Sequence, residues 1–159
     1  MIDTLWPGRK LTNQVRGFRC LQFGRAPLCE LEMLYAAKKV TVSEPALLIR
    51  INRLYRPGMT AEALYEATRG VWPIGQRRLG AKYALAVFEG VVRQAYEIHS
   101  WHQAGTTPYR TRTPEEVKSD RRWEFLGAVA QSIASKYCGG SVASYLPRGA
   151  QFPVTYVNC

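Results

Sequence analysis

The sequence predicts an α+β fold, in which a small, curved, mixed β-sheet or pseudobarrel is accompanied by short helices and preceded by a basic N-terminal extension. Five short apolar segments have the alternation or the length of β-strands, and one helical pattern falls between the first and the second of them. The N-terminal part is instead rich in arginine and interrupted by glycine. Five strands with a helix after the first favour a sheet that curls strongly on itself.

The chain is expected to divide into an arm with a short helix at 1–44 and a compact domain at 45–159. Residues 1–27 carry five basic side chains against one acid, and their glycines interrupt any helical period. A short helix is predicted after Pro27, because the acids of that segment come early and its lysines late, as the helix dipole prefers. The remaining length is sufficient for one hydrophobic core.

The first half of the domain is predicted to run from a strand through a helix to a central strand. Residues 46–52 are predicted as a strand with Leu47, Ile49 and Ile51 on one face, and Thr60 is the expected N-cap of a helix over residues 61–72. Residues 82–89 are apolar on both faces and carry small alanines on one of them. This pattern is typical of a central strand that lies against a close-packed helix.

The second half is predicted to begin with a hairpin strand over residues 91–101, with Val92, Tyr96 and Ile98 on one face. The remaining elements, in chain order, are a polar loop over 105–121, a strand over 122–130, a helix over 131–137, a short helix over 141–146 capped by Ser141, and a strand over 152–159.

The charge of the chain points to an anionic partner. With 22 lysines and arginines against 12 acids the net charge is +10, and nucleic acid is the commonest polyanion that compensates such an imbalance. A membrane surface is the rival, but no apolar run approaches the roughly 20 residues of a spanning helix, and the N-terminus lacks the apolar core of a secretory signal. We therefore expect a soluble, cytoplasmic protein that binds DNA or RNA and no membrane.

Neither a metal nor another cofactor is expected. The four cysteines are too widely spaced for a zinc pattern, and without a secretory signal they are expected to be reduced. His99 and His102 are three residues apart, which on a strand places them on opposite faces. The sequence also lacks a nucleophile elbow and a Gly-rich phosphate loop.

The strongest functional signal lies between Arg50 and Lys82, where seven cations stand against two acids and aromatic residues are interleaved. Fixed positive charge beside flat aromatic faces suits a polyanion with exposed bases. Two local acids cannot neutralise seven cations, so several of these side chains are expected to meet phosphate. The candidate nucleic-acid contacts of this segment are Arg53, Tyr55, Arg56, Arg69, Trp72, Arg77 and Arg78.

Two interpretations of the tryptophans stay open. The ring of Trp72 either stacks on a base from an exposed loop or plugs the open end of the sheet. Trp101 either packs under the polar loop that follows it or contributes to a site there, since loops on a rigid strand carry recognition contacts. The candidate nucleic-acid contacts of this second region are Trp101, His102, Tyr109 and Arg110.

The order of several short motifs resembles the PUA-like superfamily. These motifs are LIRINRLYRPGM, LYEATRGVW, AKYALAVFEGVV, YEIHSWH, RWEFLG and GAQFPVTYVN, and together they cover roughly residues 45–159. The chain is similar to small bacterial domains placed beside the EVE, ASCH and SRA groups. The resemblance implies a pseudobarrel that holds a nucleotide, often a modified base, in a pocket on a curved sheet, and a place in restriction (defence) or RNA-modification systems.

Two other functions stay open. Some ASCH-type domains hydrolyse small modified nucleosides with a lysine and a glutamate, and the resemblance would assign such a reaction to Lys82, Glu97 and Glu124. Lys82 and Glu89 bracket the central strand, too far apart in an extended chain to meet, so the acid would come from another strand. The remaining alternative is a non-catalytic accessory protein whose basic face binds an acidic protein partner.

Overall fold

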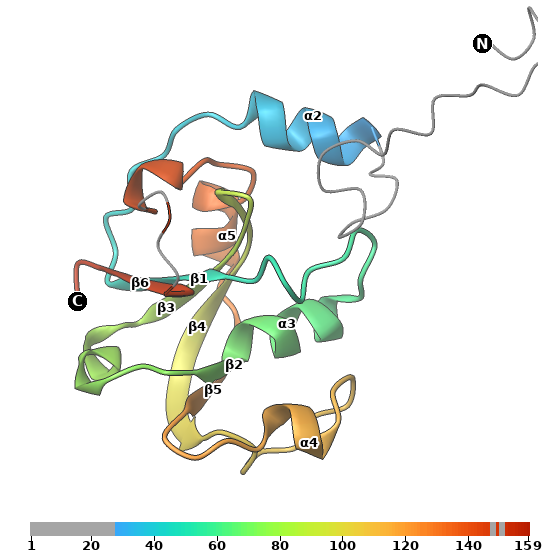
Figure 1. Ribbon diagram of the computed structural model, residues 1–159. Coiled ribbons are helices and arrows are strands. Elements are labelled where there is room, and N and C mark those ends of the chain that lie inside the picture. Colours follow the sequence, from blue (N-terminus) through green and yellow to red (C-terminus); the bar gives the residue numbers. More distant parts are fainter. Residues whose placement is uncertain (1–27, 147–148, 150–151) are drawn as a thin grey trace, which may run out of the picture.

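A computed structural model describes residues 28–146, 149 and 152–159, which form one six-stranded sheet with short helices (Figure 1). The strands are β1 (Ala46–Arg50), β2 (Gly70–Trp72), β3 (Tyr83–Phe88), β4 (Val91–Gln103), β5 (Trp123–Val129) and β6 (Val154–Val157). The helices are α2 (Leu28–Ala36), α3 (Ala61–Arg69), α4 (Pro114–Val117) and α5 (Gln131–Tyr137), with 3-10 turns η1 (Gln76–Gly80) and η2 (Ala143–Tyr145). The predicted α+β class is confirmed, whereas the expected basic arm at 1–27 lies outside the described residues.

The sheet is mixed and curls into a half-barrel. Its strand order is β2-β5-β4-β3-β1-β6, with β1 parallel to β3 and all other neighbours antiparallel. The predicted central position of β3 is therefore confirmed. The outermost strands β2 and β6 leave the half-barrel with two free edges.

Both faces of the sheet are buried. On one face Leu47 and Ile49 of β1 lie beside Ala84 and Ala86 of β3, and α3 packs over them with Tyr65. The small alanines let the helix approach closely, as the sequence predicts. The opposite face packs on α5, with a core that includes Leu48, Leu85, Val87, Val92, Ile133 and Tyr137. Each fully buried leucine contributes about 1.5–3 kcal/mol to this arrangement.

The helix predicted over residues 61–72 is shorter than expected. α3 begins after the Thr60 cap, whose hydroxyl accepts from the Ala63 amide at 3.2 Å, but it ends at Arg69. The following three residues are the edge strand β2, which pairs with β5. A Cβ atom on Gly70 would lie 2.5 Å from Oη of Tyr109 and 2.8 Å from Cβ of Glu124, so only glycine permits this close approach.

A β-bulge divides the predicted hairpin strand. The register between β3 and β4 shifts between Ala86 and Val87, where the partners change from Gln94 to Val92. Val92 therefore lies in the core beneath α5, while Tyr96 and Ile98 lie on the α3 face. The expectation that these three side chains share one face is wrong, because one extra residue reverses the alternation.

Three further segments differ in detail from the predictions. The expected loop over 105–121 contains α4, which starts at a capping box formed by Thr113 and Glu116. Ser141 does not cap the short helix, because η2 follows Val142 and Ser141 instead forms bridges with neighbouring chain segments. Residues before the expected domain boundary also join the core, since Val42 is only 3% exposed. Every helix in the described part of the chain is too short or too polar to span a bilayer.

Candidate functional site

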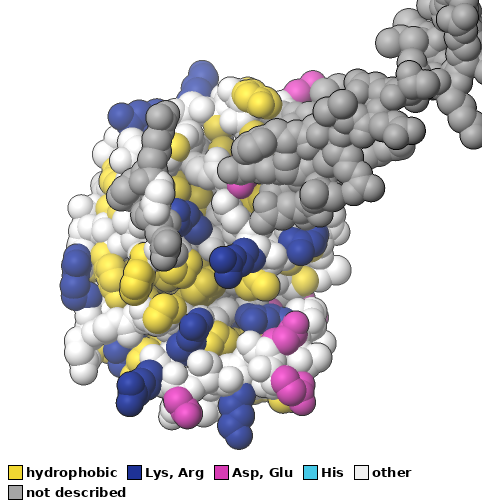
Figure 2. Space-filling model, in the orientation of Figure 1, with side chains coloured by type: hydrophobic (Ala, Val, Ile, Leu, Met, Phe, Trp, Pro, Cys, Tyr) yellow, Lys and Arg dark blue, Asp and Glu magenta, His cyan; other side chains and the backbone are white. Residues whose placement is uncertain are grey.

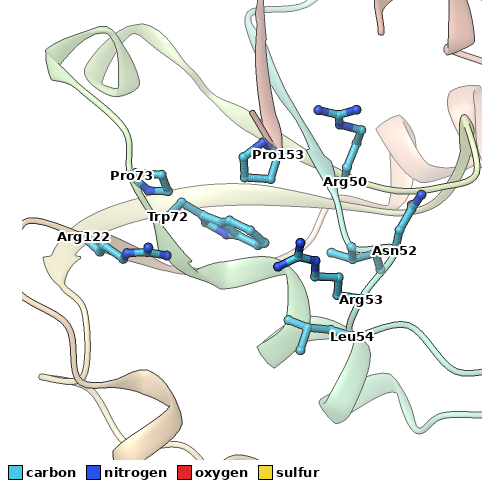
Figure 3. A pocket seen from close by; sticks show the side chains of 9 residues that line it. Arg50, Asn52, Arg53, Leu54, Trp72, Pro73, Arg122 and Pro153 are labelled. Carbon is cyan, nitrogen blue, oxygen red and sulfur yellow. The ribbon is translucent and has the colours of Figure 1, made fainter. Parts of the chain in front are cut away.

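An open hollow of about 810 Å³ is bordered by both free edges of the half-barrel (Figure 3). Its walls come from the end of β1 and the turn after it, from the end of β2, and from the residues just before β5 and β6. The lining residues are Arg50, Ile51, Asn52, Arg53, Leu54, Trp72, Pro73, Arg122 and Pro153. Because these segments are distant in sequence, only the folded sheet brings them together.

Trp72 is the aromatic side chain of the hollow. Its indole lies at the centre of the lining residues in Figure 3, with Pro153 nearby. The indole Nε1 donates to the carbonyl oxygen of Thr68 at 2.7 Å, and only 8% of the residue is exposed. The ring is thus fixed by α3 behind it. Trp72 both closes the open end of the core and lines the hollow, so the two interpretations of this side chain are not exclusive.

Three arginines surround this indole. Arg50 donates to the carbonyl oxygen of Phe152, and Arg122 donates to that of Val71 at 3.4 Å. Arg53 is exposed, and Figure 3 shows its guanidinium on the side of Trp72 opposite to Arg122. None of the described residues that line the hollow is acidic. The hollow therefore combines an apolar floor with a cationic rim.

Basic and hydrophobic side chains adjoin on the face of the molecule drawn in Figure 2. Lysine and arginine border a band of hydrophobic residues there, and acidic side chains lie mainly toward the lower edge. An acidic side chain contacts one of the lining residues: Nδ2 of Asn52 donates to Oε1 of Glu89 at 2.9 Å, and the Glu89 amide donates back to Oδ1 of Asn52 at 3.2 Å. This pair fixes the amide plane of Asn52 against the turn between β3 and β4.

Burial removes three predicted contacts from the set of surface candidates. Tyr55 is 6% exposed and stacks on Phe88 with ring centroids 4.3 Å apart. Arg69 is 2% exposed and Arg78 is 7% exposed. The guanidinium of Arg78 lies 3.6 Å from the ring centroid of Trp123, so it is held by a cation–π contact in the interior and does not meet solvent phosphate.

Arg56 and Arg77 are exposed but do not line the hollow. Arg56 donates to the carbonyl oxygens of Arg53 and Tyr55, at 3.0 and 2.7 Å. Arg77 donates to the carbonyl oxygen of Cys159 at 2.5 Å and lies over the ring of Tyr156 at 4.7 Å. The expectation that one member of the Arg77–Arg78 pair faces solvent is met by Arg77.

The second predicted region is held together by a buried carboxylate. Glu124 is fully buried and accepts four hydrogen bonds, from the amides of Gly105 and Thr107 and from the hydroxyls of Thr107 and Tyr109, at 2.7–2.9 Å. Burial alone would raise the pKa of Glu124, but these donors outweigh it and the pKa is lowered from its usual value. Burial also raises the pKa of Tyr109, so its hydroxyl stays a donor.

Two neighbouring groups complete this network. Arg69 donates to Oγ1 of Thr107 at 2.6 Å and to the Pro108 carbonyl, with its guanidinium 3.6 Å from the Tyr109 ring centroid. Glu66 accepts from the amides of Arg110 and Thr111, at 2.6 and 2.8 Å, and its pKa is lowered because these bonds outweigh burial. The loop after β4 is therefore bound to the end of α3 by charged side chains.

The other members of this region do not converge on the hollow. Trp101 packs edge-on against Phe125 with ring centroids 5.7 Å apart, which favours the interpretation that this side chain packs beneath the loop. His102 contacts the Ser100 hydroxyl at 2.8 Å, and Arg110 forms an exposed ion pair with Glu62 at 3.3 Å.

The three residues of the hydrolase alternative are not assembled into a site. Lys82 precedes β3 and is exposed, and Glu97 is exposed on β4 opposite Tyr83. Glu124, on β5, pairs with His102 of β4 at the other end of the β4–β5 ladder from Glu97, and it accepts hydrogen bonds from Gly105, Thr107 and Tyr109 of the loop. Within the described part of the chain, no three or more His, Cys, Asp or Glu side chains cluster so that they could hold a metal ion.

Sequence reasoning missed part of the hollow. Arg122, Asn52 and Leu54 line it but are not among the predicted contacts, and Arg50 is predicted only as one of the cations of its segment. The local sequence holds no signal for Arg122, because only the pairing of Trp72 with Trp123 in the folded sheet carries it to the rim. Comparisons with protein-family models, curated proteins and solved structures give no match to this chain.

Proposed function

We infer that this chain is a nucleic-acid-binding module that seats a nucleobase in the hollow against Trp72. The observation that carries this proposal is the joint placement of one indole and three arginines around a space whose described lining residues include no acid. Arg50, Arg53 and Arg122 would contact the phosphates that flank the seated base. The net charge of +10 supports the same class of partner.

The chemistry of the hollow matches the two parts of a nucleotide. Stacking of a base on an aromatic side chain is worth about 1–3 kcal/mol, and the indole of Trp72 is the aromatic group that lines the hollow. Guanidinium groups bind phosphate oxygens through paired N–H donors. The volume of about 810 Å³ falls within the range of small-molecule sites, roughly 300–1,000 Å³, so a nucleotide fits without opening the core.

The half-barrel supports, in addition, the proposal of a PUA-like domain. The resemblance implies a pocket on a curved sheet, and this chain has a curled mixed sheet whose edges border a hollow. On this proposal a modified or flipped base is a candidate ligand, and a role in restriction or RNA modification follows as the expected context.

Fluorescence anisotropy with labelled oligonucleotides tests the function. Single- and double-stranded DNA and RNA of matched sequence are titrated with the protein between 50 and 200 mM salt. If the three arginines each neutralise one phosphate of a single strand, the slope of log K against log salt is about −2, and affinity falls roughly 16-fold over this range. Lack of binding by all oligonucleotides at 50 mM salt would overturn the proposal.

Variants of the lining residues locate the site. Arg53→Ala should lower the steepness of the salt slope by about 0.7, while Trp72→Leu should weaken binding about 5-fold or more with the slope unchanged, because stacking releases few ions. Arg77→Ala is the matched control, since Arg77 is exposed but outside the hollow. Equal losses in Arg53→Ala and Arg77→Ala would show that the charge is diffuse. A stoichiometric acidic protein that survives nuclease treatment would instead favour the accessory role.

A further inference from the structure

The side chains that line the hollow offer hydrogen-bond donors to a ligand. Of those in the described part of the chain, Asn52 alone carries an acceptor atom, and its amide is engaged on both sides by Glu89, at 2.9 and 3.2 Å. The indole Nε1 of Trp72 is engaged by the carbonyl oxygen of Thr68. The polar side-chain groups that remain for a ligand are therefore guanidinium groups, which donate hydrogen bonds and accept none.

The backbone acceptors of this wall are also largely engaged. The lining residues whose carbonyl oxygens already accept a hydrogen bond from within the chain are Ile51, Arg53, Trp72, Arg122 and Pro153. A ligand that turned an amino group toward this rim would bury a donor beside other donors, and an unpaired buried donor weakens binding. The hollow is therefore suited to a ligand whose edge consists of acceptors.

Guanine is the base with such an edge. Its O6 and N7 are adjacent acceptors, and an arginine binds them with two parallel N–H donors. Adenine keeps N7 but carries an amino donor in place of O6, and cytosine likewise presents an amino group. The two purines have nearly the same area for stacking on an indole, so the polar edge distinguishes them in this hollow.

Arg122 is held where the edge of a stacked base would lie. Nη1 of Arg122 donates to the carbonyl oxygen of Val71 at 3.4 Å, and the Arg122 carbonyl oxygen accepts from the amide of Ala104 at 3.0 Å. Arg121 has a φ of 62°, in the left-handed region, so the chain turns sharply just before this residue. Figure 3 shows the guanidinium of Arg122 directed toward the indole of Trp72. The bond to Val71 uses one of five N–H groups, which leaves a pair for a ligand.

Resting on the function proposed above, we propose that the hollow selects guanine, and that Arg122 donates to O6 and N7 of a base stacked on Trp72. Arg50 and Arg53 hold the flanking phosphates. This inference narrows the role of Arg122 to the base. Two neutralised phosphates give a salt slope of about −1.4 for a guanine ligand, where three phosphate contacts would give about −2.

Single strands of eight nucleotides with one guest base in an otherwise abasic backbone test this preference. They have equal charge, and they are made in the DNA or RNA form that binds more tightly in the anisotropy titration. Competition against a labelled strand at 50 mM salt should show guanine bound about 5- to 150-fold more tightly than adenine. Hypoxanthine keeps O6 and N7 and should match guanine, whereas 7-deazaguanine lacks N7 and should lose much of the advantage.

A charge-conserving substitution tests the assignment to Arg122. Arg122→Lys removes the paired donors and should bring guanine and adenine to nearly equal affinity, while Arg53→Lys should keep the preference for guanine. Arg77→Lys is the matched control, because Arg77 is exposed but outside the hollow, and it should bind as the parent does. Melting temperatures are compared first, since Arg122 also contacts Val71. The hypoxanthine and 7-deazaguanine strands test the same contact on the unaltered chain.

The two proposals fail in different ways. If guanine and adenine bind equally but more tightly than the fully abasic strand, or if 7-deazaguanine binds as guanine does, the selection of guanine is refuted and the nucleic-acid function stands. Loss of the preference in Arg53→Lys but not in Arg122→Lys would refute the assignment to Arg122. If no guest base improves on the abasic strand, no base is seated in the hollow, and if no strand binds at all, the function itself fails.

Discussion

Replacement of Glu124 by glutamine tests the claim that a buried carboxylate holds the loop after β4. The four donors divide evenly, with the Thr107 amide and hydroxyl on Oε1 and the Gly105 amide and Tyr109 hydroxyl on Oε2. Either orientation of a glutamine amide places its NH2 group against a backbone N–H, which cannot reverse its role as a donor. At least one charge-assisted hydrogen bond is lost and one buried N–H is left unpaired.

The expected magnitude follows from these losses. A hydrogen bond to a charged group contributes about 1.5–3 kcal/mol, and an unpaired buried donor costs about 1–3 kcal/mol, partly offset because glutamine is cheaper to bury than a carboxylate. Glu124→Gln should therefore lower the free energy of unfolding by about 2–4 kcal/mol at pH 7. For a chain of this size that corresponds to a melting temperature lower by about 4–16 °C.

The pH dependence gives an independent check. Because the folded-state pKa of Glu124 is lowered, its stabilising contribution is present above the unfolded value near 4.5 and is lost as pH falls through the folded value. The difference in the free energy of unfolding between the parent and Glu124→Gln should therefore become smaller as pH falls below 4.5. Urea unfolding at pH 7, 5 and 3.5 measures it, with Glu97→Gln, at an exposed site on β4, as the control expected within about 0.5 kcal/mol of the parent. A difference below about 1 kcal/mol at pH 7, or one that does not depend on pH, would refute the reasoning.

Three further substitutions test other parts of the structure. Gly70→Ala should reduce stability by about 1–3 kcal/mol in urea unfolding, because its Cβ would overlap Tyr109 and Glu124, whereas Gly75→Ala, with nothing within 4 Å, should not. Arg69→Met should lower the free energy of unfolding by about 2–4 kcal/mol, because it leaves buried acceptors unpaired. The control Arg77→Met, at an exposed site, should lower it by less than about 0.5 kcal/mol. Equal effects of the two substitutions would contradict the interior role of Arg69. Hydrogen bonds from Lys136 and Tyr137 lower the pKa of Glu44 to about 2. The melting temperature of Glu44→Gln should therefore lie below that of the parent at pH 7, and this difference in melting temperature should disappear as pH falls from 4.5 to 2.

The strands that the sequence predicts are those with enough residues to show a pattern. β3 is apolar throughout and β1 is apolar over its first four residues, so both are recognisable, and their burial on two faces follows from the same residues. β2 has only three residues and directly follows a helix, so no periodicity can distinguish it from one more helical turn. The bulge in β4 changes the register by a single residue, which the local sequence does not encode because it depends on the partner strand.

The candidate site, like the fold, can be predicted from the sequence only in part. A run of cations with aromatic residues predicts that Trp72 and Arg53 belong to one basic region, and both line the hollow. The sequence does not reveal that Arg69 and Arg78 are interior, because their partners are backbone carbonyls and aromatic rings, whereas a count of acids considers only ion pairs. Arg122 and Pro153 join the site because strand pairing and a backbone hydrogen bond from Arg50 bring these remote segments together.

The position of the hollow follows from the incomplete closure of the sheet. An edge strand exposes backbone groups that need partners, and in β2 the carbonyl oxygens of Gly70 and Val71 accept from Arg112 and Arg122, at 3.0 and 3.4 Å. Where the half-barrel stays open, the last core aromatic, Trp72, reaches the surface. The arginine that protects the edge thus becomes part of the cationic rim, and the tryptophan that closes the core becomes the floor. If the hollow binds nucleic acid, Arg122→Met should both weaken the binding and destabilise the pairing of β2 with β5, whereas Arg53→Ala should affect the binding alone. Hydrogen exchange at the β5 amides, measured beside anisotropy, separates the two effects, and unchanged exchange in Arg122→Met would show that the edge does not depend on this side chain.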